Sequence, residues 1–138
     1  MPKGVAAILL SAFALATPSF GEEPSVTRDT YDAYVGAFTV QEHLNACERH
    51  APAAVEQFRV EVSALRGVND GALRRLGPAA RKWSLPGDRP IEEVLARIHK
   101  STDAYYSEAS VDAATSRCRN LLETLLASNK PLDRTRGR

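Results

Sequence analysis

The chain has 138 residues, of which 43% are hydrophobic and 25% charged, with a formal net charge of +1 at pH 7. This length fits one domain with a modest hydrophobic core. The balanced charge excludes the strongly basic surface typical of proteins that bind nucleic acid or anionic membranes. We therefore expect no nucleic-acid partner.

Residues 1–21 are predicted to be a secretory signal peptide. Lys3 supplies a positive start, and the apolar run over 5–16 precedes small residues. That run is too short to span a hydrocarbon core about 30 Å thick. Cleavage after Ala16 or after Gly21 satisfies the small-residue rule, and we favour the second because it releases a polar N-terminus. We expect an exported protein, periplasmic or alternatively secreted, without a transmembrane segment in the mature chain.

Charge is unevenly distributed along the mature chain. Without Lys3, the 18 lysines and arginines become 17, which equals the number of aspartates and glutamates. Residues 22–65 hold eight acids and three arginines, whereas 66–100 hold eight basic residues and four acids. The two complementary regions are expected to meet within the fold, or one of them contacts a charged partner.

Residues 22–128 are predicted to form a single helical domain. The first helix is expected to be capped by Thr27 or Asp29 and to run toward His50. Its apolar stripe has spacings of three and four residues: Ala33, Ala37, Val40, Leu44 and Cys47. Further apolar residues fall on its other sides, so the helix is either surrounded by other elements or bent at Gly36. A strand over 33–40 is the alternative.

Pro52 is predicted to end the first helix and open a second, because proline is tolerated in a first turn. The second helix carries one stripe: Val55, Phe58, Val62 and Leu65. The turn residues over 67–71 are expected to end it. A shorter helix at 72–76 is then interrupted by Gly77–Pro78, and another piece reaches Trp83.

Two longer helices are predicted after a loop over 84–90. Asp88 is expected to cap the first, which ends near Glu108 and whose stripe is Ile91, Val94, Leu95, Ile98, Thr102 and Tyr105. Ser110 is expected to cap the last helix, whose stripe is Val111, Ala114, Cys118, Leu121 and Leu125, widened by Leu122 and Leu126. Residues 129–138 are predicted to be a disordered basic tail.

The two cysteines, Cys47 and Cys118, lie on the apolar stripes of the first and last helices. Export to an oxidising compartment favours a disulfide between them. A bridge across 71 positions restricts the unfolded chain by about 4 kcal/mol on the loop-entropy model. The predicted fold class is therefore all-α: a small bundle of four to five helices with one interhelical disulfide.

The alternatives to a disulfide are two unpaired buried thiols and a metal or haem site. His43, Cys47 and His50 are spaced four and three residues apart, so on a helix they project from one face. A structural zinc site needs four ligands, and the remainder would come from His99 or Glu42. The haem attachment motif Cys-x-x-Cys-His is absent from the sequence. We expect no cofactor and keep a metal- or haem-binding helical protein as the second hypothesis.

A candidate surface contact is the sequence Arg81-Lys82-Trp83, which places the single tryptophan beside two positive charges. It either contacts a peptide, glycan or lipid headgroup, or the tryptophan covers the open end of the core. The sequence has no paired carboxylates, phosphate-binding loop, nucleophile elbow or zinc-protease helix. A small hydrolase whose site forms only in the fold is the third hypothesis.

These features together predict a small exported, non-enzymatic binding or interaction module of the bacterial envelope, with a chaperone-like role included. Its partner is expected to be an envelope or extracellular protein. In architecture alone, the combination of a signal peptide, short helices and one disulfide resembles small bacterial envelope chaperones and other small periplasmic helical proteins.

Overall fold

The computed structural model describes residues 23–84 and 87–128. This part of the chain is helical and contains no strand; its elements are α2 (Arg28–His50), α3 (Pro52–Gln57), α4 (Arg59–Lys82), α5 (Ile91–Ser107) and α6 (Val111–Ser128). The predicted small all-α bundle with an interhelical disulfide is confirmed. The predicted signal peptide and basic tail lie outside the described residues, as do Leu85 and Pro86 of the predicted loop.

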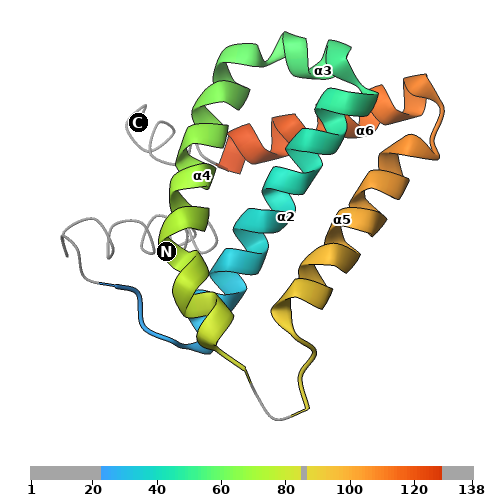
Figure 1. Cartoon of the computed structure of the whole chain (residues 1–138). Helices are drawn as coiled ribbons and strands as arrows, with labels where there is room; N and C mark the ends of the chain where they lie inside the picture. Colours follow the sequence, from blue (N-terminus) through green and yellow to red (C-terminus); the bar gives the residue numbers. More distant parts are fainter. Residues whose placement is uncertain (1–22, 85–86, 129–138) are drawn as a thin grey trace.

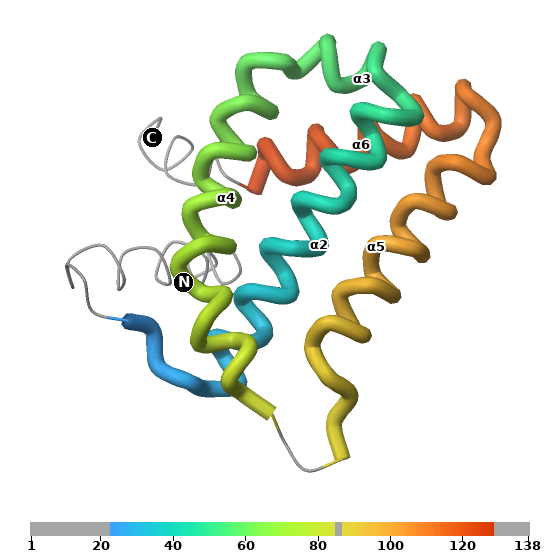
Figure 2. The backbone as a smooth tube through the Cα atoms, in the orientation of Figure 1, coloured from blue at the N-terminus to red at the C-terminus, as the bar shows by residue number. Residues whose placement is uncertain are grey.

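Helix α2 is the centre of the bundle. It contacts α3, α4, α5 and α6, and Figures 1 and 2 show α4 and α5 on either side of it with α6 crossing behind. The apolar residues of the first half of α2 pack against α4 and α5, which accounts for apolar side chains on more than one side. The helix runs uninterrupted through Gly36, so the strand alternative for 33–40 is wrong.

Helix caps agree with the sequence at two of the three predicted positions. The Thr27 hydroxyl accepts a hydrogen bond from the Thr30 amide at 3.2 Å, and the Ser110 hydroxyl accepts one from the Ala113 amide at 3.1 Å. Each bond satisfies an amide that has no partner within its helix. At α5 the prediction is wrong, because Pro90 rather than Asp88 occupies the N-cap position.

The predicted turn at 67–71 is not a turn, and the break at Gly77–Pro78 is absent. Helix α4 continues through both segments to Lys82 and contains Pro78 in its interior. The buried Asn69 amide donates to the Ala37 carbonyl at 2.7 Å and to the Gln41 side chain at 3.1 Å, which binds the middle of α4 to α2. Tertiary packing here outweighs the low helix propensity of glycine.

The break falls instead at Phe58, between α3 and α4. Phe58 has φ −118° and ψ 30°, and its amide donates to the Val55 carbonyl at 3.0 Å. Val55 and Val62 are both buried in the same cluster, against which Phe58 packs. The chain therefore turns where three apolar side chains of one predicted stripe converge on a common core, although no glycine or proline marks the position.

The core has two parts, one toward each end of α2. The first surrounds the disulfide, and its larger members are Leu44, Cys47, Val55, Val62, Tyr106, Cys118 and Leu122. The second lies between the N-terminal half of α2, the C-terminal half of α4 and the start of α5, and consists of Tyr34, Ala72, Leu76, Ala80, Ile91 and Leu95. Among the helices described, none is both long and apolar enough to cross a membrane.

The stripes of α5 and α6 differ from the sequence expectation at one residue each, Tyr105 and Val111. Tyr106, not Tyr105, is the buried tyrosine of α5, and Tyr105 is 49% exposed. Val111 at the start of α6 is exposed, whereas Leu122, which was expected to widen the stripe of this helix, is fully buried. The exposed Tyr105 becomes available to line a surface site.

Candidate functional site

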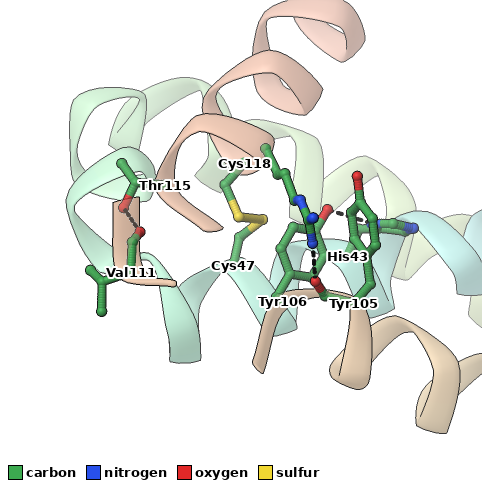
Figure 3. Close-up of a disulfide and its surroundings, with 8 residues drawn as sticks. His43, Cys47, Tyr105, Tyr106, Val111, Thr115 and Cys118 are labelled. Atoms are coloured by element: carbon green, nitrogen blue, oxygen red, sulfur yellow. Dashed lines mark hydrogen bonds between the residues drawn. A yellow bond between two sulfur atoms is a disulfide. The ribbon is translucent and has the colours of Figure 1, made fainter. Parts of the chain in front are cut away.

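A disulfide joins α2 to α6, as the apolar positions of the two cysteines predicted. Cys47 and Cys118 are bonded through their sulfur atoms, with a Cα–Cα distance of 5.7 Å, and both are fully buried (Figure 3). The bond lies in the first core cluster, beneath the side of the bundle that carries Tyr106 and His43.

The three residues of the metal hypothesis are not brought together as ligands. Cys47 has no thiolate to offer because its sulfur is bonded to Cys118. His43 Nδ1 lies 2.7 Å from the Tyr106 hydroxyl, and His50 Nε2 lies 2.9 Å from the Asp103 carboxylate. Over residues 23–84 and 87–128, no group of three or more histidine, cysteine, aspartate or glutamate side chains has a metal-binding arrangement.

Every histidine of the chain instead joins α2 to α5. His99 on α5 pairs with Glu42 on α2, with 2.5 Å between Nδ1 and Oε1, and Asp103 on α5 accepts from Arg49 at 2.7 Å in addition to His50. Hydrogen bonds from Arg49 and His50 lower the pKa of Asp103 below its ordinary value. We call the contacts of these three histidines the histidine seam.

A surface groove of about 550 Å³ opens beside the histidine seam, between α5 and α6, with α2 contributing one residue. We call it the α5–α6 groove. It is lined by aromatic, hydroxyl, amide and cationic side chains: His43, Ser101, Thr102, Tyr105, Tyr106, Arg117, Asn120, Leu121 and Thr124. Its size falls in the range of binding sites for small ligands or a few side chains of a partner.

The floor of the groove is polar but uncharged. Burial lowers the pKa of His43 below 6.5, against a weaker opposing effect of Glu42. Burial also raises the pKa of the Tyr106 phenol to about 12. At neutral pH the hydroxyl and the imidazole are therefore both neutral, and their 2.7 Å hydrogen bond satisfies polar groups that are partly removed from water.

The rim of the groove is an arginine held against a tyrosine. The Arg117 guanidinium lies 4.3 Å from the centre of the Tyr105 ring, and it also donates to the Tyr105 backbone carbonyl. The Tyr105 ring meets the Tyr106 ring edge-on at 4.9 Å. Sequence reasoning missed this groove, although the Tyr105-Tyr106 pair was a signal, because adjacent side chains on a helix point about 100° apart and two large rings in sequence rarely both fit the core face.

The hydroxyl that lies against a histidine in the groove is the buried Tyr106 phenol, whose pKa is raised rather than lowered. The Ser101 hydroxyl donates to the Ile98 carbonyl of its own helix at 3.3 Å, and His43 is bonded to Tyr106. Nucleophilic catalysis requires a nucleophile within hydrogen-bond reach of its base. The Ser101 hydrogen bond instead goes to its own helix, and burial keeps the Tyr106 phenol protonated at neutral pH.

The side chains of Arg81, Lys82 and Trp83 lie in different surroundings. Trp83 is half-buried against the Tyr31 ring, with centroids 4.8 Å apart, and Arg81 pairs with Glu92 at 3.2 Å while its guanidinium lies over the Tyr34 ring. Lys82 is exposed. Trp83 thus packs on Tyr31, which itself packs against the second core cluster, and the contacts of Arg81 join α4 to α5 and α2.

Three comparisons with known proteins give no relative. No protein-family model matches the sequence, and neither a curated protein nor a solved structure matches it at a significant level.

Proposed function

We propose that the protein is a small exported interaction module of the bacterial envelope that binds a protein partner through the α5–α6 groove. The observation that carries the proposal is the contact between the exposed Tyr105 and the half-buried Arg117 at the groove rim. Tyrosine and arginine are enriched where protein surfaces make their strongest contacts.

The rigidity of the groove supports the same proposal. Its floor is fixed by the hydrogen bond between His43 and Tyr106, and the disulfide lies in the core below it. A surface that is already ordered loses less conformational freedom on binding, so more of the contact energy appears as affinity.

Site-specific photo-crosslinking in the native host tests this function. A photoreactive residue at Asn120, which lines the groove, should give a discrete crosslinked protein, whereas the same residue at the exposed Ser63 on α4 should not. The Asn120 crosslink should disappear when Tyr105 is replaced by alanine. Equal labelling from both positions, or none from Asn120, would contradict the proposal.

Export is tested on the same cells by osmotic shock and intact-mass measurement. We expect the protein in the released fraction, beginning at Glu22 after cleavage following Gly21, with a mass two hydrogens below that of the reduced chain because of the disulfide. Full-length protein retained in the cytoplasm would contradict the export part of the proposal.

A further inference from the structure

We propose that Arg117 and Tyr105 bind an aspartate or glutamate side chain of the partner that occupies the α5–α6 groove. This inference rests on the proposed function, which it deepens by naming the chemistry of the partner.

Arg117 differs from most arginines in the described part of the chain. Seven others form ion pairs with a carboxylate: Arg28, Arg49, Arg59, Arg66, Arg81, Arg89 and Arg97. Arg117 has no carboxylate within ion-pair distance among the residues described. Its side chain is nevertheless positioned, by the Tyr105 ring at 4.3 Å and by the Tyr105 carbonyl.

The charge carried by the groove lining is positive. None of the residues lining it is an aspartate or glutamate, and Arg117 is its one permanent cation. Burial lowers the pKa of His43, so this side chain adds no charge at neutral pH. An acidic group in the groove would therefore meet a cation and no competing carboxylate in the lining.

The geometry suits a carboxylate in particular. A guanidinium is planar and presents several donors, so it can keep its bond to the Tyr105 carbonyl and still offer donors to two carboxylate oxygens. Leu121 and the Tyr105 ring supply apolar contact for the stem of the acidic side chain. The Asn120 amide and the Thr124 hydroxyl supply partners for a peptide backbone.

An acidic residue in the next depression sets a direction for the bound segment. Glu123 lines a shallow depression that shares Thr124 with the groove. Like charges repel, so the carboxylate of the partner belongs at the Arg117 end of the groove and away from Glu123.

The test is a selection of random seven-residue peptides displayed on phage against the mature, oxidised protein. The selected peptides are then tested against the Tyr105→Ala variant. Peptides that no longer bind this variant are counted as groove-binding peptides. We expect these peptides to share an aspartate or glutamate, and changing that residue to its amide should weaken binding about tenfold.

Variants of the protein test whether Arg117 is the residue that binds the peptide carboxylate. Arg117→Gln should weaken binding of the acidic peptides about tenfold. It should also remove the difference in affinity between each acidic peptide and its amide form, as expected for two groups that interact directly. Arg117→Lys should lie between the two because it keeps the charge and loses the planar fork. The matched control is Arg119→Gln, since Arg119 is on the same helix, outside the groove lining, and contacts Gln57; this variant should bind as the unaltered protein does.

The outcomes separate this inference from the proposed function. Groove-binding peptides without a shared acid, or equal binding by Arg117→Gln and the unaltered protein, would overturn the acidic partner and leave the binding groove in place. A selection that yields no groove-binding peptide, together with no crosslink from Asn120, would overturn both. Thermal unfolding of each variant verifies that the fold is intact.

Discussion

Tyr106 is the residue on which the groove floor depends. It is 2% exposed, its ring belongs to the cluster around the disulfide, and its hydroxyl reaches His43 on the neighbouring helix. The adjacent Tyr105 turns its ring outward to the groove rim. Two consecutive residues of the same type therefore have different roles, one in the core and one at the surface.

We expect Tyr106→Phe to lower the free energy of unfolding by about 1 kcal/mol, because it leaves the partly buried His43 Nδ1 without its partner. Urea denaturation at neutral pH measures the loss. Tyr105→Phe is the matched control and should change the free energy of unfolding by less than about 0.5 kcal/mol, since its ring is half exposed. Equal losses in the two variants would show that the hydrogen bond contributes nothing.

Acid should weaken the folded state through His43. Burial lowers its pKa in the folded protein below the ordinary value of 6.5, so the unfolded chain binds this proton more readily. Stability contributed by the neutral imidazole is therefore lost as pH falls below about 6.5. The Tm advantage of the unaltered protein over His43→Gln should be larger at pH 8 than at pH 5.5, and titrating groups that do not interact with His43 cancel in this difference.

At lower pH, Asp103 adds a second loss. Its pKa is lowered by hydrogen bonds from Arg49 and His50, so its contribution to stability is present above the ordinary value of 3.8 and disappears as pH falls through the lower folded value.

A Tm difference between the unaltered protein and His43→Gln that does not change with pH would contradict the role given to His43.

At the scale of elements, Gly36 of α2 and Gly77 of α4 differ in their surroundings. Gly36 lies inside α2 and is exposed, and a methyl group added there meets no atom within 4 Å. Gly77 in α4 is buried, and the same group would lie 3.3 Å from the Tyr34 ring and 3.0 Å from Arg81. Gly77 thus allows close approach of α4 to Tyr34, whereas Gly36 has no such contact.

Gly36→Ala should raise the free energy of unfolding by about 0.5–1 kcal/mol, because alanine restricts the unfolded chain and favours the helix. Gly77→Ala should lower it, because Tyr34 or Arg81 must move. Thermal unfolding of the two variants side by side provides the comparison. Stabilisation by both substitutions would show that the contact at Gly77 is loose.

At the scale of the whole molecule, the disulfide fixes where α6 lies. Helix α6 packs against α2, α3 and α5 at one end of the bundle, while the second core cluster contains no residue of α6. The bond between Cys47 and Cys118 ties this helix to the central one. The groove depends on this placement because four of its lining residues belong to α6.

Reduction of the disulfide should lower the free energy of unfolding by about 4 kcal/mol, from the restriction that a loop of this length places on the unfolded chain. Denaturation with and without reductant measures the change. The double variant Cys47→Ala/Cys118→Ala is the control and should not respond to reductant. A loss below about 1 kcal/mol in the unaltered protein would show that packing alone holds α6.

Much of this architecture could be predicted from local pattern. The spacing of apolar residues identified α2, α5 and α6, the caps Thr27 and Ser110 were correct, and the matching apolar positions of Cys47 and Cys118 indicated the disulfide. These features depend on helical periodicity and on short side chains next to free amides, both of which are local properties of a chain.

The remaining features were decided by contacts between distant residues. Asn69 is buried against α2 and binds there, so α4 continues through a sequence that reads as a turn, and the chain bends at Phe58 instead. The α5–α6 groove likewise exists because the bundle orients Tyr105 and Arg117 toward each other. Periodicity and capping are fixed by neighbours along the chain, whereas a helix break or a binding site depends on which surfaces the tertiary structure buries and which it leaves exposed.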